Sequence, residues 1–441
     1  MPRPTSIDLF AGCGGLSLGL HQVGFEHLFA IEKDPMAFET FEANFLAPEA
    51  PYKSFAQWPF WLERRPHDIE EMLRDSFLRQ CLTSLRGRVD LVCGGPPCQG
   101  FSVGGIRDGQ DHRNTLPQRY LDFVRLVRPR TVILENVEGM TRSFVARPGE
   151  CAISYADWLV NQLQEIGYNA EFRVLNASHF GVPQTRMRVI IFGFLKNAFS
   201  QDATPARLFE FLSRGTGRFL ASKGLPTDRP VTVREALDDL NGERRAVCPD
   251  SPSFASGTYT TPHSQYAVML RRGVPDTAIP NSHRFSEHKA ETLAFYRRVQ
   301  TTQRHGRLSK EFLRANGMQK DKKVWIDPEV PASTITTHPD EFIHYDHPRI
   351  VTVREMARLQ SFPDDFVFKG RYTINGDRRG LDVARCVQVG NAVPPLFGEA
   401  VGLAVKEFLN TCRRRDVATQ VPQPILQIAQ ATLFTAEAQI T

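Results

Sequence analysis

Short apolar runs alternate with amphipathic segments along the first 195 residues of the chain. Such alternation predicts strands joined by helices and is typical of a doubly wound α/β sheet. The connection between the last two strands is too short for a helical crossover, so we expect them to pair antiparallel at the sheet edge. Helices are expected over 35–45, 119–127 and 155–166, and strands over Ser6–Phe10, His27–Glu32, Val89–Cys93, Thr131–Leu134, Ala170–Asn176 and Arg188–Phe194.

The pattern changes at about residue 196, where Gly, Pro, Ser, Thr and Arg become frequent and periodicity weakens. This texture continues to about residue 345 and predicts a second, irregular domain. Regular helix patterns return at 352–362 and at 395–409, where two prolines precede an apolar helix. The last thirty residues are neither clearly helical nor strongly charged, and we expect a loosely held tail.

The composition indicates an ordinary globular protein of 441 residues, with 41% hydrophobic and 23% charged residues. No apolar run is long enough to span a bilayer, and the first residues lack a signal-peptide pattern, so an intracellular protein is expected. The eight cysteines form no CxxC pair and no zinc-like spacing, which favours reduced thiols over disulfides or a metal site.

Charge is concentrated in one segment, although the formal net charge of +5 is too small to identify a nucleic-acid partner. Residues 292–323 hold nine Lys or Arg residues and two acidic ones. A solvated helix face would explain this run, and a surface that contacts phosphates is the alternative.

A glycine turn in "IDLFAGCGGLSLGL" joins the first strand to a helix, where open parallel sheets bind nucleotide-like ligands. Gly12 and Gly14 let the backbone approach a ligand, but Ser17 stands where the dinucleotide fingerprint has its third glycine. Glu32 closes the next strand, where an acidic side chain can accept hydrogen bonds from ribose hydroxyls. The alternative is an exposed acidic residue beside Lys33. Asp68 follows what we interpret as a short third strand and is a further candidate contact.

The segment "GGPPCQGFS" places Cys98 just beyond the carboxyl end of an apolar strand, between prolines and glycines. Most free cysteines are small buried side chains, which is one interpretation of Cys98. The rigid surroundings favour a thiol held at a fixed place, which must lose its proton to act as a nucleophile. No histidine lies nearby in the sequence, so a thiol–imidazole protease site is disfavoured.

Polar residues also end the later strands. Glu135 emerges from an apolar run, where burial would favour a protonated, proton-donating form; a structural carboxylate paired with an arginine is equally compatible. Arg186 and Arg188 begin a strand on the same face and can hold an anion or a carbonyl oxygen. Asn391 lies in a Gly-Asn pair before a helix, which is sufficiently explained as a turn.

Taken in order, six stretches resemble the motifs of the DNA cytosine-5 methyltransferase family, and the match covers most of the chain. The resemblance implies a Rossmann-like, S-adenosylmethionine-dependent methyltransferase sheet with a smaller, irregular target-recognition domain, and the compact layout is similar to bacterial restriction–modification methylases. It implies methyl transfer from S-adenosylmethionine to ring carbon 5 of cytosine. The stretches are "DLFAGCGGLSLGL", "GGPPCQGFS", "ENVEGM", "QTRMRVIIFG", "TVREMARLQSFPDDF" and "QVGNAVPPLFGEAVG".

The resemblance also assigns roles. Cys98 would attack ring carbon 6, and Glu135 would bind and protonate ring nitrogen 3. Arg186 and Arg188 would lie near the nucleophile and the cytosine carbonyl, and no metal is implied. The expected S-adenosylmethionine contacts are Phe10, Gly12, Gly14, Glu32, Lys33, Asp68, Ile69, Pro97, Asn391 and Val393.

A target cytosine must leave the duplex before carbon 6 can be reached, at a cost of a few kcal/mol that DNA contacts must offset. Arg354 and Gln360 are expected to brace the recognition domain, and the helix from Pro395 is expected to pack back on the first sheet. DNA contacts are expected from Gln99, Ser102, Arg297, Arg298, Arg304, Arg307 and Lys310.

The implied domain organisation is a catalytic domain over 1–195, a target-recognition domain with hinge and ninth motif over 196–385, a return to the catalytic domain over 386–412, and a tail over 413–441. A cytoplasmic, nucleoid-associated monomer is expected, with any restriction endonuclease acting separately. Three alternatives remain. A tRNA cytosine methyltransferase is disfavoured because the Cys-Phe-Thr signature is missing, a non-catalytic DNA-binding relative because Cys98 and Glu135 are present, and a nicotinamide-dependent oxidoreductase because it leaves both unexplained.

Overall fold

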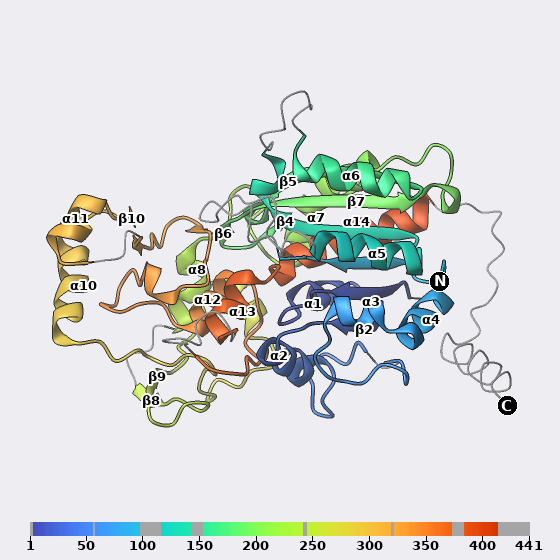
Figure 1. Ribbon diagram of the computed structural model, residues 1–441. Coiled ribbons are helices and arrows are strands. Elements are labelled where there is room, and N and C mark those ends of the chain that lie inside the picture. Colours follow the sequence, from blue (N-terminus) through green and yellow to red (C-terminus); the bar gives the residue numbers. More distant parts are fainter. Residues whose placement is uncertain are drawn as a thin grey trace.

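The central feature of the computed structural model is one six-stranded sheet, with a smaller group of elements at the far end of the molecule (Figure 1). The structure describes residues 3–55, 58–97, 116–142, 153–240, 245–318, 322–372 and 383–412.

The strands of this sheet lie in the order β2-β1-β3-β4-β7-β5, and the first four are parallel. β7 runs antiparallel to both β4 and β5, which confirms the expected antiparallel pair at the edge. The carboxyl ends of the parallel strands and the beginning of β7 therefore meet at one edge of the sheet. The bounds are β1 Thr5–Leu9, β2 Glu26–Ile31, β3 Leu91–Gly94, β4 Thr131–Val137, β5 Tyr168–Asn176 and β7 Met187–Leu195.

The sheet is covered by two groups of helices, as expected for a doubly wound fold. α1 packs on α14 and α14 on α7, while α3, α4, α5 and α6 form the other group. The three expected helices are present within a few residues of their predicted bounds. The bounds are α1 Gly15–Gln22, α2 Pro35–Phe45, α3 Ile69–Arg74, α4 Ser76–Ser84, α5 Leu116–Val127, α6 Tyr155–Glu165, α7 Ala206–Ser222 and α14 Pro395–Thr411.

Helix starts in this region follow the capping residues in the sequence. The Asp34 side chain accepts a hydrogen bond from the backbone N–H of Ala37 and is followed by Pro35, so α2 begins where the sequence predicts. Ser154 and Asp157 form a capping box at the start of α6. Such caps satisfy backbone donors that have no partner within the helix.

The prediction of a short strand before Asp68 is wrong. Among the described residues between β2 and β3 there is no strand. Two backbone hydrogen bonds join this segment to β2 and its end: the His67 N–H donates to the Glu32 carbonyl (2.8 Å), and the His27 N–H donates to the Ser54 carbonyl (3.1 Å). Aromatic side chains pack instead: Phe55 stacks on His27, and Trp61 meets Phe29 edge to face. Hydrophobic packing therefore holds this connection beside the sheet where a strand ladder was expected.

The C-terminal helix α14 returns to the first sheet, as expected. It packs against α1 so closely that a Cβ atom on Gly19 would lie 2.5 Å from the backbone nitrogen of Glu399. Gly398 and Gly402 leave similar gaps for Leu16 and Leu20. Residues from the two ends of the chain thus form one layer beside the sheet.

The region between α7 and α14 has short elements, in keeping with its weak periodicity. Its β-strands are two or three residues long, and β12 pairs with β6, which directly precedes β7. The bounds are β6 Gln184–Thr185, α8 Val233–Leu237, β8 Arg245–Val247, β9 Ala255–Gly257, α9 Gln265–Leu270, α10 Ala290–Thr302, β10 Gly306–Arg307, α11 Lys310–Ala315, β11 Val324–Trp325, β12 Ala332–Ser333, β13 Phe342–Ile343, α12 Val353–Leu359 and α13 Arg385–Asn391. The 3₁₀ helices are η3 Glu138–Thr141, η4 Ala177–Phe180, η5 Lys196–Ala198, η6 Asp238–Leu240 and η7 Pro339–Glu341.

A small second hydrophobic core lies in this region, apart from the main core. It is built by α10, α11 and the neighbouring short strands, which form the end of the molecule opposite the six-stranded sheet (Figure 1). Its buried members are Phe295, Tyr296, Val299, Leu308, Leu313, Trp325 and Ile343.

No helix within the described ranges is long and apolar enough to cross a membrane.

Candidate active site

The glycine turn after β1 adopts the left-handed backbone conformation at Phe10 (φ 57°), Gly12 (φ 56°) and Gly14 (φ 96°). A Cβ atom on Gly14 would lie 2.4 Å from the Phe45 ring, so packing as well as backbone conformation demands glycine there. A Cβ on Gly12 would meet nothing within 4 Å. Gly12 therefore faces open space, as a turn that approaches a ligand should.

Glu32 lies beside this turn and is held by backbone donors. Its two carboxylate oxygens accept hydrogen bonds from the N–H groups of Gly12 and Asp34, both at 2.8 Å. Burial raises the pKa of Glu32, and the backbone N–H groups partly offset that effect. The carboxylate is thus fixed at the end of β2, next to the open side of the turn.

Asp68 joins the same cluster through its ion pair with Lys33, at 2.6 Å. Its side chain also accepts a hydrogen bond from the N–H of Glu70 and so caps α3, whose first residue is the buried Ile69. Burial opposes ionisation, but Lys33 and the backbone N–H outweigh it and lower the pKa of Asp68. The structure thus brings together predicted cofactor contacts from three segments of the chain, namely Gly12, the pair Glu32 and Lys33, and Asp68.

The α13–α14 segment reaches the other side of the turn. A Cβ on Gly15 would lie 2.2 Å from the carbonyl oxygen of Val393, so the two backbones are in direct contact. Asn391 is the last residue of α13, which corrects its interpretation as a simple turn residue. Pro97 is exposed and follows β3 at the same sheet edge.

Glu135 forms the second part of the site. Its carboxylate pairs with the Arg188 guanidinium at 2.8 Å, and their side chains are only 11% and 10% exposed. Burial lowers the pKa of Arg188, and the Glu135 carboxylate opposes that effect. The Glu135 carboxylate is thus paired with an arginine at the sheet edge where chemistry was expected. Its role as a proton donor stays a prediction.

Arg186 is buried and points across the site toward backbone carbonyl groups. Its guanidinium donates hydrogen bonds to the carbonyls of Ile335 (3.1 Å), Gly390 (2.8 Å) and Ala392 (3.2 Å). Its Nε is buried without an acceptor among the described residues. Burial lowers the pKa of Arg186, and Arg188 adds to that effect. Arg186 therefore ties the start of β7 to two distant segments, and its Nε–H has no partner in the described part of the chain.

Cys98, Gln99 and Ser102 lie outside the described residues, so their predicted roles are not addressed by the geometry. The predicted DNA contacts that are described are all exposed. They lie on or between α10 and α11, around the second core; these residues are Arg297, Arg298, Arg304, Arg307 and Lys310.

α12 carries the bracing residues. Arg354 is fully buried and donates to the carbonyls of Asn281 (3.0 Å), Pro363 (3.0 Å) and Phe366 (2.7 Å). Gln360 accepts a hydrogen bond from Gln184 and donates one to the Val389 carbonyl. Arg354 and Gln360 therefore join α12 and its end to other segments of the chain. That they brace a recognition domain stays a prediction.

Sequence reasoning missed a third bracing residue, Arg358. It is fully buried between the carboxylates of Asp239 (2.9 Å) and Asp364 (2.6 Å). Asp239 lies more than one hundred positions before Arg358 in the sequence, so no local sequence pattern could have indicated this cluster. Burial acts to lower the pKa of Arg358, but the two carboxylates outweigh that effect and raise the pKa above its ordinary value.

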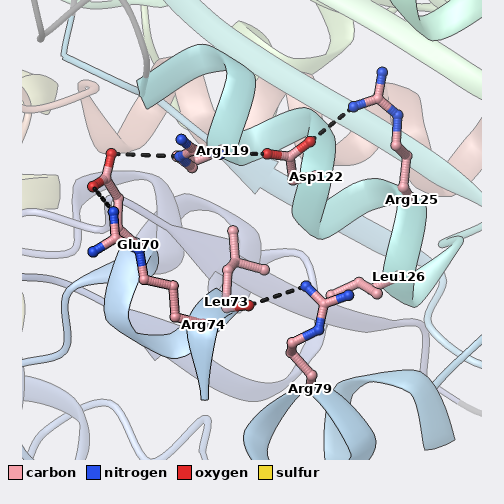
Figure 2. Close-up of a pocket in the computed structure, with 8 residues that line it drawn as sticks. All are labelled: Glu70, Leu73, Arg74, Arg79, Arg119, Asp122, Arg125 and Leu126. Atoms are coloured by element: carbon pink, nitrogen blue, oxygen red, sulfur yellow. Dashed lines mark hydrogen bonds and ion pairs between the residues drawn. The ribbon is translucent and has the colours of Figure 1, made fainter. Parts of the chain in front are cut away.

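A hollow of about 270 Å³ between α3, α4 and α5 is lined by four arginines and two acidic residues (Figure 2). Arg119 pairs with both Glu70 (3.4 Å) and Asp122 (2.9 Å), and these carboxylates also pair with Arg74 and Arg125. None of the predicted site residues lines this hollow. The two carboxylates thus pair with three of the four arginines, as in a structural ion-pair network, and Arg79 donates to the Leu73 carbonyl. The arginines of the lining outnumber its acidic residues by two.

No group of three or more His, Cys, Asp and Glu side chains suited to a metal ion occurs in the described part of the chain.

A mixed sheet with this strand order, helices on both faces and a polar cluster at the carboxyl ends of its strands has the fold of S-adenosylmethionine-dependent methyltransferases. The sequence model for C-5 cytosine-specific DNA methylases matches residues 5–407. The chain therefore belongs to the family of C-5 cytosine-specific DNA methylases, and it is a DNA cytosine-5 methyltransferase.

Named relatives support the assignment along the whole match. The Type II methyltransferase M1.HphI of Haemophilus parahaemolyticus is 29% identical over 407 residues, which is 91% of this chain and 86% of the relative. The Type II methyltransferase M.XorII of Xanthomonas oryzae is 30% identical over 435 residues, which is 93% of this chain and 86% of the relative.

Solved structures support the fold. A protein described as a DNA modification methyltransferase, encoded within an E. coli prophage, matches with a TM-score of 0.60 and 23% identity over 92% of this chain and 99% of that chain. The S. pombe Dnmt2 methyltransferase matches with a TM-score of 0.52 and 14% identity over 93% of this chain and 100% of that chain. At these identities the likeness concerns the fold alone.

Proposed function

We propose that this chain methylates cytosine in duplex DNA with Cys98 as nucleophile and S-adenosylmethionine as methyl donor. The observation that carries the proposal is the convergence of the Glu135–Arg188 pair with the end of β3, whose chain continues through Pro97 into Cys98. A Cβ on Gly95 would lie 3.0 Å from a carboxylate oxygen of Glu135. The carboxyl group and the start of the nucleophile segment are therefore adjacent.

The reaction requires a carbon nucleophile where the aromatic ring offers none. The Cys98 thiolate adds to ring carbon 6, and Glu135, once protonated, gives its proton to ring nitrogen 3, which makes carbon 5 nucleophilic. Arg188 orients the carboxyl group and places positive charge where negative charge gathers on the base. After methyl transfer, water takes the carbon 5 proton, and the electron pair of that bond expels the Cys98 thiolate from carbon 6. The proton on ring nitrogen 3 returns to the Glu135 carboxylate, which restores the aromatic ring and the enzyme.

The residues around the glycine turn fit an S-adenosylmethionine molecule. Bound there, the donor supplies an electrophilic methyl group on a sulfonium. Open space over Gly12 leaves room for the ligand, and the Glu32 carboxylate is fixed to accept ribose hydroxyls. We expect Asp68, which is held by its ion pair with Lys33, to contact the base end of the ligand. The remaining proposed contacts are Phe10, Gly14, Lys33, Ile69, Pro97, Asn391 and Val393.

DNA is held, in this proposal, by a target-recognition domain over 196–385 that contacts phosphates through the exposed basic residues around α10 and α11. The names of the relatives support a Type II restriction–modification setting, with methylation at a specific short sequence and any endonuclease acting as a separate protein. We propose a cytoplasmic monomer.

The test is methylation of cellular DNA followed by bisulfite sequencing. Cells expressing the wild-type chain should show protected cytosines within one short sequence, and cells expressing Cys98→Ser at equal levels should show none. Full activity of Cys98→Ser would refute the proposed nucleophile. A wild-type enzyme that transferred methyl groups to RNA and to no cytosine in duplex DNA would refute the proposed substrate.

A further inference from the structure

We propose that Asn136 is a positioning residue that pins the start of the nucleophile segment to the strand carrying the carboxyl group. This inference rests on the proposed role of Cys98. Asn136 lies in β4 directly after Glu135, and it is buried with a relative exposure of 5%. Because neighbouring residues of a strand point to opposite faces, Asn136 and Glu135 serve different partners.

The hydrogen bonds of Asn136 define the orientation of its amide. The side-chain oxygen accepts the N–H of Val137 at 2.8 Å, so the nitrogen must point the other way. That nitrogen donates to the carbonyl oxygen of Pro96, also at 2.8 Å. A polar group buried to this degree is costly to leave unpaired, so both bonds resist displacement.

The Pro96 carbonyl has no neighbouring strand to hold it, because β3 ends at Gly94. Proline lacks an N–H, so the two consecutive prolines Pro96 and Pro97 offer no donor for a β ladder. Two neighbours of this backbone come from β4, namely the Glu135 carboxylate beside Gly95 and the Asn136 amide, which donates to the Pro96 carbonyl. The end of β4 therefore fixes this backbone on two sides.

Cys98 follows Pro96 by two residues, and the rigid φ of Pro97 limits how far the chain can turn between them. A shift of Pro96 relative to Glu135 would therefore change the relation of the sulfur to the carboxyl group. Both groups must meet one pyrimidine ring, and a displacement of about 1 Å costs on the order of 100-fold in rate. The Asn136–Pro96 hydrogen bond is thus placed to keep that relation constant.

The experiment compares Asn136→Ala and Asn136→Ser with wild type at saturating S-adenosylmethionine and DNA. Ala removes both hydrogen bonds, while the Ser hydroxyl is too short to reach the Pro96 carbonyl. We expect the single-turnover rate of methyl transfer to fall by about 10- to 100-fold in both variants. The dissociation constant for DNA should change by less than about threefold, because no DNA contact is assigned to Asn136.

The matched control is Asn44→Ala in α2. Asn44 is also buried, and its amide likewise bonds backbone groups, at Thr40 and Val367. We expect this variant to lose melting temperature and to retain the wild-type single-turnover rate. If Asn136 were only structural, its variants would behave in the same way, and that result would overturn the inference.

A readout of thiol addition separates this inference from the proposed function. DNA containing 5-fluorocytosine should trap wild-type enzyme covalently, and Asn136→Ala should be trapped more slowly by a similar factor. Equal trapping rates in folded wild-type and Asn136→Ala enzyme would overturn the positioning role and leave the Cys98 chemistry standing. Absence of trapping in wild type would overturn both. If Asn136→Ala failed to fold, Asn136→Ser would provide the same comparison.

Discussion

The carboxyl edge of the six-stranded sheet and the unit around the second core hold their charged residues in opposite ways. At the sheet edge, Glu135 and Arg188 are nearly buried and paired, and Arg186 is bound to carbonyl groups from distant segments. Around the second core, the arginines of α10 are exposed, and the described core has seven buried residues. One region fixes its charges in the protein, whereas the other presents them to solvent.

This difference matches two different tasks. Chemistry requires groups held within fractions of an ångström, and buried pairs on a rigid sheet provide that precision. Phosphate contacts require charge at the surface and tolerate adjustment, because the attraction depends little on orientation. We therefore expect substitutions at the sheet edge to act on the rate of methyl transfer and substitutions around the second core to act on DNA affinity.

The largest expected effect comes from Glu135→Gln, which keeps an oxygen for Arg188 but cannot give a proton to the base. The single-turnover rate should fall by about 100-fold or more, since a positioned acid contributes roughly 10²–10⁴-fold. DNA affinity, measured by fluorescence anisotropy, should change much less. Loss of affinity with an unchanged rate would instead make Glu135 a structural carboxylate and break the comparison.

A second prediction concerns the buried side of the same region. Asp8 in β1 is 1% exposed and accepts a hydrogen bond from the Ser17 hydroxyl at 2.6 Å. Burial raises the pKa of Asp8 to about 7, from 3.8 for an ordinary aspartate. The folded protein therefore keeps a proton that the unfolded chain releases at lower pH.

The free energy of unfolding should consequently fall as the pH rises from about 4 to about 7, by on the order of 2–4 kcal/mol from this group. Asp8→Asn, which cannot ionise, should lack that part of the pH dependence. Urea unfolding of both proteins from about pH 4 to about pH 8 measures the difference. Parallel pH profiles would show that Asp8 is already ionised in the folded protein.

The smallest expected effect belongs to the exposed unit. Arg297→Gln and Arg304→Gln should each weaken DNA binding several-fold and lower the salt slope of binding by about 1 if each contacts one phosphate. Binding titrations at several salt concentrations measure this slope. Arg218→Gln, an exposed arginine on α7, is the matched control and should leave it unchanged. An unchanged slope in all three variants would assign the basic run to a solvated helix face.

Local sequence patterns predicted the six-stranded sheet, because each strand is an apolar run with defined ends. They failed before Asp68, where aromatic packing and two backbone hydrogen bonds take the place of the expected strand. The pattern of apolar residues cannot distinguish a strand paired with β2 from an irregular segment packed on it, since both place apolar side chains against β2. The candidate cofactor residues still came together, because their positions follow from where β1 and β2 end.

Pairings between distant residues could not be predicted. The ion pair of Glu135 depends on Arg188, which comes from a neighbouring strand in antiparallel register. Arg358 and its two carboxylates, and the hydrogen bond from Asn136 to Pro96, likewise join segments far apart in the sequence. The family motifs indicated which residues matter, but their contacts required the fold.

Everything proposed for the sheet edge depends on a transient bond between Cys98 sulfur and carbon 6 of an extruded cytosine. Intact-mass spectrometry of the purified enzyme, incubated with S-adenosylmethionine and duplex DNA carrying 5-fluorocytosine in its target sequence, tests that bond directly. We predict a stable one-to-one adduct in wild type, mapped to the peptide containing Cys98 and absent from Cys98→Ser. Methylation of ordinary DNA with no adduct, or an adduct on another residue, would contradict the account.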